Sequence, residues 1–520
     1  MTKYIIILMA TILLSSCVSQ RDTNTLRLRI SSDPTTLDPA LMVDVVGGIV
    51  GAKIFNGLVK YGDGMKIVSD IAKTWDVSSD GKTYTFHLRN DVEFTNGQLV
   101  VASDFKYSFQ RILLSKTKSP RRWVFKDVLG ADEADNGDVN GFVIKDKHTF
   151  QIVLTKPFSP FLGFLAMPAG YVIPEEEVKK WGEDFSEHVV GTGPFLLTKW
   201  VHDDMLILKK NIKYFDKKPK VDGIEYRVIP EELTAMAEFE SGAIDTIGLP
   251  LAEFERFTTS DKWKKNIIGQ VGLNAYYLGI NCQKKPFDDV RVRQALNYAI
   301  DKKAILETIL KNQGVLSHGS IPPILSGYNH KLSAYEYNPQ KAKELLKDAG
   351  CQSLTLKIYQ KPNREVLNVT EIMQAQLKDA GIMAEIVQVE WSALKEMINQ
   401  GKCDTFYLAW LADYPDAENF LAPLFHSENF GAGGNRAQYK NEKVDKLIEE
   451  AQSIPDEKKR LKIYQQIETI IHDDAPWVFL WHQKEFAVHQ SWIKGYKCFP
   501  IYNADKGVDV RIDMCHEQHK

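Results

Sequence analysis

The sequence predicts an α/β protein made of two α/β bodies, with a smaller β-rich subdomain inserted in the first. Strand and helix patterns alternate between residues 338 and 411, and a second alternation of this kind covers 186–270. Such alternation favours sheets covered by helices. The segment 59–185 instead contains short strands with tight turns, which favours antiparallel pairing. A chain of 520 residues, of which 44% are hydrophobic, is long enough to bury these cores.

The region 338–411 gives the clearest elements. Asn338 and Pro339 are typical of a helix start, and helical spacing of apolar residues follows. Glycines that suit helix ends stand at positions 350, 381 and 401, and each precedes a run that suits a strand. Because crossover connections are right-handed, these strands should be parallel. The last run, Phe406 to Leu411, is apolar and is expected to be a fully buried strand.

Turn and cap residues place the other elements. Asp80-Gly81 lies between the strand patterns Thr74–Val77 and Thr83–Leu88 and predicts a hairpin. Ser103 is expected to cap a helix. Further strands are predicted at 26–30, 149–154, 224–229 and 243–247, a helix at 233–240, and a long helical pair at 441–472.

The N-terminus has the pattern of an export signal. Lys3 precedes an apolar run from Tyr4 to Leu14, which is too short to span a bilayer and suits a secretory signal. The order Leu14-Ser15-Ser16-Cys17 resembles a bacterial lipobox, in which the cysteine is acylated and becomes the new N-terminus. The alternative is an ordinary signal peptide cut elsewhere. The lipobox interpretation predicts a protein outside the cytoplasm, anchored to a membrane through lipid on Cys17.

Composition and missing motifs exclude several classes of function. The formal net charge is −3 and the basic residues are dispersed, so we expect no nucleic-acid partner. The chain lacks the phosphate-binding, zinc-protease and nucleophile-elbow motifs, and Gly191-Thr192-Gly193 lacks the third glycine of a dinucleotide loop. We therefore expect no catalytic residues, no cofactor and no metal.

The remaining cysteines carry little information. Five follow Cys17, with wide spacing and no C-x-x-C. Export permits a disulfide, but the sequence does not identify a pair. The terminal cluster Cys515, His516 and His519 is more typical of a chain end than of a metal site.

The most suggestive site is the segment from Trp410 to Asp416. A buried strand ends there, and a turn brings aromatic and acidic side chains together. Ligands of open α/β sheets bind outside the carboxyl ends of strands. Asp413 could receive an ammonium group there, with Trp410 and Tyr414 as apolar walls. Asp416 is better explained as the cap of a helix beginning near Ala417.

The chain resembles the bacterial oligopeptide- and dipeptide-binding proteins, which are the extracytoplasmic solute-binding components (family 5) of peptide ABC transporters. The resemblance covers nearly all of the mature chain. Its motifs are Asp33-Pro34-Thr35-Thr36-Leu37-Asp38-Pro39, Asp80-Gly81-Lys82-Thr83-Tyr84-Thr85-Phe86, Gly191-Thr192-Gly193-Pro194-Phe195, Phe287-Asp288-Asp289-Val290-Arg291-Val292-Arg293-Gln294-Ala295, and the segment from Trp410 to Pro415.

The resemblance implies a two-lobed periplasmic-binding-protein fold with an extra β-rich subdomain in lobe one. It implies that the protein binds oligopeptides in a cleft between the lobes. It should deliver them to a membrane permease and a cytoplasmic ATPase, working as a monomer in the periplasm or at the cell surface. The corresponding division of the chain is a signal peptide at 1–16, a tether at 17–25, lobe one at 26–58, 186–270 and 481–520, the subdomain at 59–185, and lobe two at 271–480.

The resemblance also assigns one ligand contact. In oligopeptide-binding members, the aspartate of the Trp-x-Ala-Asp-Tyr pattern holds the α-ammonium of the ligand, which here is Asp413. The other candidate peptide contacts are Trp410, Leu411, Tyr414, Tyr276, Asn281 and Tyr407. Tyr407 stands where some members have an arginine for the ligand carboxylate, and Leu411 where they have a cysteine. Arg121 and Arg122 could receive that carboxylate, although a solvated loop is the preferred interpretation.

The sequence is also compatible with other functions. The same fold could bind a dipeptide, a peptidoglycan-derived peptide, a nickel chelate or haem, because function depends on the site and not on the fold. The Asp413 motif favours a ligand with a free amine, which haem lacks. A surface peptidase and an adhesin or signalling receptor are the rivals from other classes.

Replacing Cys17 with alanine should release the protein from the membrane. Lipid chains on the cysteine would supply the anchor, and stable anchoring requires two or more of them. Cell fractionation of the wild type and the variant measures this directly. A variant that stays in the membrane fraction to the same extent would refute the lipid anchor.

Overall fold

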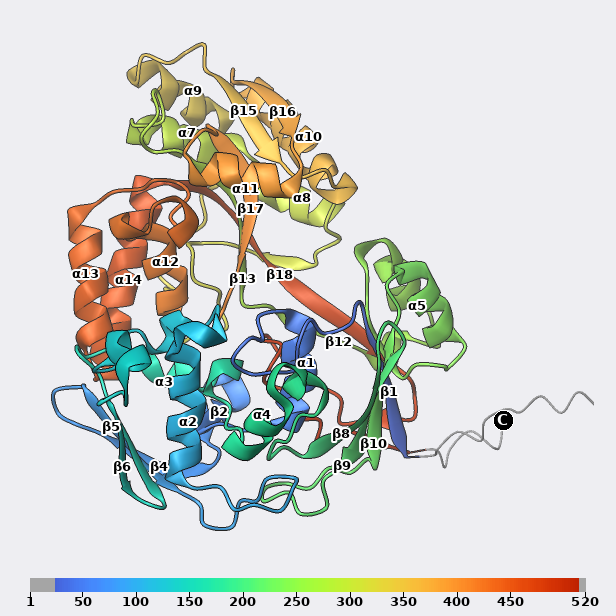
Figure 1. Ribbon diagram of the computed structural model, residues 1–520. Coiled ribbons are helices and arrows are strands. Elements are labelled where there is room, and N and C mark those ends of the chain that lie inside the picture. Colours follow the sequence, from blue (N-terminus) through green and yellow to red (C-terminus); the bar gives the residue numbers. More distant parts are fainter. Residues whose placement is uncertain (1–23, 514–520) are drawn as a thin grey trace, which may run out of the picture.

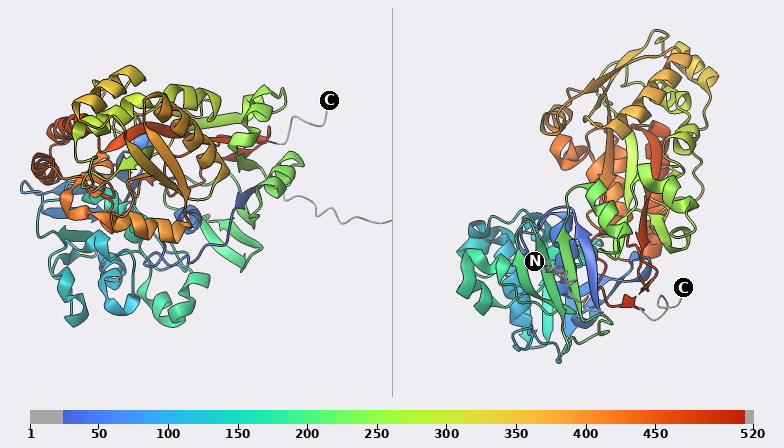
Figure 2. Two further views of the ribbon diagram at one scale, coloured as in Figure 1. Left: turned by 90° about the horizontal axis from the view of Figure 1, so that it is seen from above. Right: turned by 90° about the vertical axis from the view of Figure 1, so that its right-hand side faces the viewer.

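The computed structural model describes residues 24–513 and shows two lobes (Figures 1 and 2). Cys17 and the cluster of Cys515, His516 and His519 lie outside the described residues. Within the described residues, no helix is both long enough and apolar enough to cross a membrane.

One mixed sheet of twelve strands runs through both lobes. Its order is β16-β15-β17-β13-β18-β11-β1-β10-β9-β8, and β12 and β14 also pair with β18. The long strand β18 (Trp477–His489) belongs to both lobes: its first half pairs with β13 and β14, and its second half with β11 and β12. The two α/β bodies predicted from the sequence are therefore joined through a shared strand (Figure 1).

Lobe one contains the part of this sheet that runs from β11 to β8, together with β12. Its strands are β1 (Thr25–Ile30), β8 (Phe195–Val201), β9 (Met205–Lys210), β10 (Gly223–Val228), β11 (Thr246–Gly248) and β12 (Ile267–Val271), and its helices are α1 (Val45–Ile54), α4 (Glu175–Trp181), α5 (Glu232–Glu240) and α6 (Phe254–Thr259). The predicted strand at 243–247 begins later, at Thr246, because the N–H groups of Ala243 and Ile244 still close the turn after α5. The short strands β19 (Ile493–Lys494) and β20 (Arg511–Ile512) pair near the end of the chain.

The subdomain is an antiparallel sheet covered by helix α2. It contains β2 (Val59–Tyr61), β3 (Ile67–Ser69), β4 (Ala72–Val77), β5 (Thr83–Leu88), β6 (Phe142–Asp146), β7 (Thr149–Val153), α2 (Ala102–Leu113) and α3 (Phe161–Leu165). The predicted β4–β5 hairpin is confirmed, with Gly81 at φ 70° in its turn. The predicted cap at Ser103 is wrong. Helix α2 is capped at Val101, whose N–H donates to the Asp104 carboxylate at 2.8 Å.

Lobe two contains the parallel unit expected from the sequence. Strand β15 (Thr355–Gln360) pairs in parallel with β16 (Met383–Gln388) and with β17 (Thr405–Leu411), which confirms that prediction. The other elements are β13 (Asn274–Ile280), β14 (Gly314–Leu316), α7 (Val290–Ala299), α8 (Lys302–Thr308), α9 (Pro339–Asp348), α10 (Arg364–Asp379), α11 (Trp391–Asn399), α12 (Ala422–Phe425), α13 (Glu442–Ser453) and α14 (Glu457–Asp474). The helical pair predicted at 441–472 is α13 and α14.

Strand β17 is buried along its first four residues and then enters the cleft. Thr405 to Leu408 are buried, whereas Ala409 and Leu411 are exposed. The prediction of a fully buried strand is thus wrong for its last three residues. The reason is that this end of the strand borders the cleft, which Trp410 and Leu411 line.

The subdomain packs against lobe two although it belongs to lobe one in sequence. A single hydrophobic core contains Phe86 and Phe109 of the subdomain together with Ile448 of α13. The N–H of Ser159 donates to the carbonyl of Gln452 at 2.7 Å. Figure 1 shows the subdomain beside one end of α13, so the lobes have a second attachment besides β18.

Replacing Gly279 of β13 with alanine should destabilise the protein. The added Cβ would lie 2.3 Å from the ring of Phe406, and overpacking of this kind costs about 1–3 kcal/mol. Gly248→Ala is the matched control, since no heavy atom lies within 4 Å of its Cβ position. Urea unfolding of both variants measures the difference, and equal midpoints would contradict the packing at Gly279.

Candidate functional site

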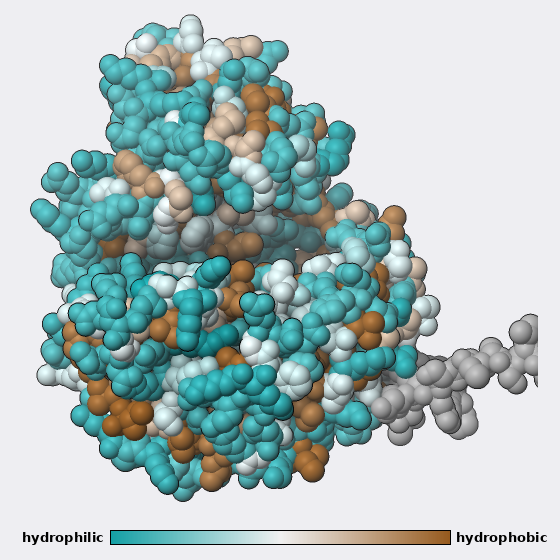
Figure 3. Space-filling view, viewed as in Figure 1, coloured by the Kyte–Doolittle hydropathy of each residue, from teal (hydrophilic) through white to brown (hydrophobic). Residues whose placement is uncertain are grey.

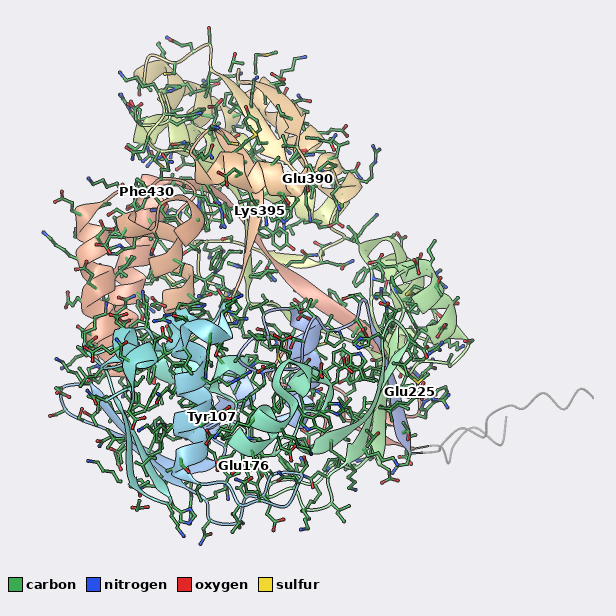
Figure 4. The ribbon with its side chains drawn as sticks, in the orientation of Figure 1. Tyr107, Glu176, Glu225, Glu390, Lys395 and Phe430 are labelled. Carbon is green, nitrogen blue, oxygen red and sulfur yellow. The ribbon has the colours of Figure 1, made fainter. Side chains whose placement is uncertain are left out.

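The cleft between the lobes contains two adjoining cavities of about 1050 Å³ and 870 Å³. The hollow is visible in the space-filling view (Figure 3), and side chains of both lobes face each other across it (Figure 4). The larger cavity is lined by lobe-one residues such as Val45 and by Leu411 and Ala412 of lobe two. The smaller cavity lies between the subdomain and lobe two and is lined by aromatic side chains, among them Trp123, Phe158 and Trp410. Asp413 lines both cavities and therefore marks the point where they meet.

Two hydrogen bonds to one amide oxygen fix the turn that carries Asp413. Asn419 Oδ1 accepts from the backbone N–H of Asp413 and from the indole N–H of Trp410, both at 3.1 Å. Asp416 accepts from the N–H of Glu418 at 2.9 Å and caps the short helix Ala417–Phe420, which confirms that prediction. The turn is thereby positioned, and the Asp413 carboxylate is left half-exposed in the cleft.

Arg121 of the subdomain faces Asp413 across the cleft. Its Nη1 lies 3.9 Å from Asp413 Oδ1, and its Nε donates to the carbonyl of Met42 at 3.2 Å. Arg121 is 7% exposed, so the interpretation of this segment as a solvated loop is wrong for Arg121. Arg122 instead donates to the carbonyl of Leu113, away from Asp413. Burial within the cleft walls raises the pKa of the Asp413 carboxyl, and the Arg121 guanidinium opposes that rise.

Tyr414 ties the turn to the helices behind it. Its ring packs edge-on against Phe164, with the centroids 4.8 Å apart, and its hydroxyl donates to the buried carboxyl of Glu418. Gln452 Nε2 donates to the other oxygen of Glu418 at 2.7 Å. Burial raises the pKa of Glu418 to about 7. Tyr414 thus serves mainly as a support for the turn, and it also lines the smaller cavity.

The structure brings together some of the predicted contacts and not others. Leu411 is 64% exposed and lines the larger cavity. Tyr276 and Tyr407 pack together on lobe two, with their ring centroids 6.4 Å apart, and Tyr407 is buried. Asn281 lies beyond the far end of β13, where its buried amide donates to the carbonyl of Gly401 at 2.9 Å. The structure therefore does not bring Asn281 to the cleft, because its amide closes a loop of lobe two.

Two residues that hold the binding turn in place were not predicted from the sequence. Asn419 and Glu418 lie three and two residues beyond the Asp416 cap, and their side chains point back at the turn. No sequence motif marks them. Within residues 24–513, no group of three or more His, Cys, Asp or Glu side chains is arranged to hold a metal ion. The four cysteines in that range, Cys282, Cys351, Cys403 and Cys498, are free thiols.

Comparison with known proteins identifies the class. The fold is that of the two-lobed periplasmic binding proteins. Residues 66–432 match the bacterial extracellular solute-binding proteins, family 5 (middle region). The chain belongs to this family, whose members are solute-binding components of transporters.

Individual relatives bind different solutes. The chain is 32% identical to the dipeptide-binding protein of Escherichia coli over 471 residues, which are 86% of this chain and 87% of the relative. It is 30% identical to heme-binding protein A of Haemophilus influenzae over 508 residues, 92% of this chain and 90% of the relative.

Solved structures show the same arrangement. HbpA2 from Haemophilus parasuis superposes with a TM-score of 0.85 at 26% identity, covering 94% of this chain and 100% of that protein. The Helicobacter pylori binding protein DppA, in complex with the peptide STSA, gives a TM-score of 0.76 at 28% identity, with coverage of 94% and 98%.

Replacing Glu418 with glutamine should change how stability depends on pH. The folded-state pKa of about 7 is higher than the unfolded value near 4.5, so folding favours the protonated form. As pH rises from about 4.5 to 7, wild-type stability should fall by up to about 3 kcal/mol from this group. The variant lacks this loss, so its free energy of unfolding relative to the wild type should increase over that range and level off above it.

Urea unfolding at a series of pH values measures the effect. The exposed Glu450→Gln on α13 is the control and should show no such trend. A difference between the Glu418 variant and the wild type that is independent of pH would rule out the raised pKa.

Proposed function

We propose that this protein binds short peptides with a free amino terminus in the cleft and delivers them to the permease and ATPase of an ABC transporter. It would do so as a monomer, held at the membrane by lipid on Cys17. The observation that carries the proposal is the Asp413 carboxylate at the junction of the two cavities. A carboxylate in that position can receive an ammonium group in a charge-assisted hydrogen bond.

The exposed end of β17 supports binding of a peptide backbone. In the described part of the chain, β15 pairs with β17 at Thr405 and Phe406, so the same edge of residues 407–411 has no strand partner. An extended peptide could add to that edge through main-chain hydrogen bonds, which do not depend on its sequence. The ammonium group would then lie at Asp413, directly after the edge ends.

The relatives provide the rival ligands. One is named for haem and others for glutathione or dipeptides. Haem has no amine to pair with Asp413, whereas peptides and glutathione have one. The proposal is therefore tested by asking whether binding depends on the amine.

We also propose the chain division that the resemblance implied. The register of β18 supports a boundary between lobes close to residue 481–484, because Gln483 pairs with Gly314 of lobe two and Lys484 with Val271 of lobe one. The chain first crosses from lobe one to lobe two at Gly272 and crosses back in β18. The N–H of Gly272 donates to the carbonyl of Gln483 at 2.9 Å, so the two crossings lie side by side. These two crossings would form the hinge.

Replacing Asp413 with asparagine should weaken the binding of free-amine peptides without unfolding the protein. Breaking one side of an enclosed ion pair costs about 2–5 kcal/mol, which corresponds to about tenfold to a few thousandfold in Kd. Isothermal titration of the full chain with a tripeptide and its N-acetylated form measures this.

Acetylation should weaken binding to the wild type by a similar factor and should have little further effect on the variant. Asp404→Asn is the control, since it makes the same change at the opposite end of β17, beside Lys284. Equal affinity of the wild type for both forms of the peptide would show that Asp413 does not bind the amine.

A further inference from the structure

The loop between β9 and β10, residues 211–222, concentrates positive charge on the surface of lobe one. Its four lysines are all exposed: Lys213, Lys217, Lys218 and Lys220. The same loop holds Ile212 with 79% of its surface exposed. The whole chain has a formal net charge of −3, so such a concentration of lysines is not a general property of this protein. These four lysines and Ile212 are called the basic face below.

The carboxylates beside the basic face do not cancel its charge. Lys217 forms an ion pair with Asp509, and Lys497 lies 3.9 Å from the same carboxylate. The hydrogen bond from Lys217 and the charges of Lys497 and Lys220 lower the pKa of the Asp509 carboxyl, so three ammonium groups surround one carboxylate. The other carboxylates there each have a lysine partner: Glu93 has Lys213, Asp216 has Lys60, and Asp222 has Lys210. A positive excess therefore remains.

Asn24 is bound directly to this loop. Its Nδ2 donates to Asp222 Oδ2 at 2.8 Å, and its carbonyl accepts from the N–H of Asp222 at 2.9 Å. Asn24 follows Cys17 by seven positions, and a chain spans at most about 3.6 Å per residue, which gives a reach of about 25 Å. A globular chain of this length has a radius of gyration of about 23 Å, so its far side is out of that reach. Lipid on Cys17 would thus bring the basic face to the bilayer.

The binding cleft lies at the other end of lobe one. The larger cavity is lined by Leu28 and Arg29, in the second half of β1, whereas Asn24 precedes the first residue of that strand. In Figure 1, β1 begins at the lower edge of lobe one and lobe two lies at the top. A bilayer in contact with the basic face would therefore leave the cleft open to solutes.

We propose that the basic face contacts the anionic phospholipid headgroups of the membrane that carries the anchor. Lysines are attracted to such a surface within a Debye length, about 8 Å at physiological salt, and the short connection to Cys17 would hold them in that range. This inference rests on one part of the proposed function, the lipid on Cys17, and not on the nature of the solute. A few lysines orient an anchored protein and do not replace the anchor, so Cys17→Ala should still be released.

Lysine footprinting of the intact lipoprotein tests the proposal. The protein is placed on vesicles of phosphatidylcholine alone or of an equal mixture of phosphatidylcholine and phosphatidylglycerol. Its lysines are then methylated with formaldehyde and borohydride, because an anionic reagent would itself be repelled by the mixed vesicles. Mass spectrometry of peptides gives the rate at each lysine.

The lysines of the basic face should react about tenfold more slowly on the mixed vesicles. Each lysine at an anionic surface favours contact by about fivefold, and several act together. In about 1 M salt the Debye length is about 3 Å, and the difference should disappear. The exposed Lys343 and Lys347 of α9, in lobe two, should react equally on both kinds of vesicle. This comparison requires no variant.

A double variant then assigns the contact to charge. In Lys217→Gln/Lys220→Gln, the remaining Lys213 and Lys218 should react almost as fast on the mixed vesicles as on the neutral ones. Lys343→Gln/Lys347→Gln is the matched control: it removes the same charge from exposed positions in lobe two, and it should keep the protection. Thermal unfolding of each variant shows whether it is folded.

The outcomes separate this proposal from the lipid anchor. If the protein is recovered with both kinds of vesicle and the basic face reacts equally on both, the headgroup contact is overturned and the anchor stands. If it is recovered with neither, the anchor fails and this proposal fails with it, whereas peptide binding in the cleft is unaffected. Protection that persists in about 1 M salt or in the double variant would also overturn a contact made by charge.

Discussion

The arrangement of this protein depends on one strand that belongs to two lobes. Strand β18 contributes its first half to lobe two and its second half to lobe one, so its hydrogen bonds tie the two halves of the sheet together. The lobe-two half is firmly held: Trp477 and Trp481 are buried, and the Trp477 ring stacks on Tyr277 with the centroids 3.6 Å apart. The middle of the strand also forms the floor of the cleft, where residues 483–487 line the larger cavity.

The binding turn is built by local contacts on this frame. Strand β17 leaves the covered part of the sheet after Leu408, and the chain turns at Asp413. One amide oxygen, on Asn419, then fixes both the aspartate and Trp410. The Asp413 carboxylate faces a guanidinium that is distant in sequence, that of Arg121 in the subdomain. The turn is thus local in origin, whereas its electrostatic environment is set by another part of the chain.

The sequence could predict the features that depend on contacts between residues close together in the chain. The hairpin at Asp80-Gly81, the parallel unit of lobe two and the cap at Asp416 all follow from residues a few positions apart, and all are confirmed. The predictions fail where the interacting residues are far apart in the sequence, or where two neighbouring side chains could make the same contact. Arg121 lies almost 300 residues from Asp413, so its role has no local signal, and its charge suggested solvent. At helix α2, Ser103 was the obvious cap, but the carboxylate of Asp104 reaches back to Val101 instead.

The contact between the subdomain and lobe two restricts how the molecule can move. The lobes are attached at β18 and again where Ser159 meets Gln452, at a separate place. The subdomain and α13 share one hydrophobic core, so moving them far apart would expose apolar side chains to water. That exposure carries a free-energy cost, which opposes a wide separation of the subdomain from α13.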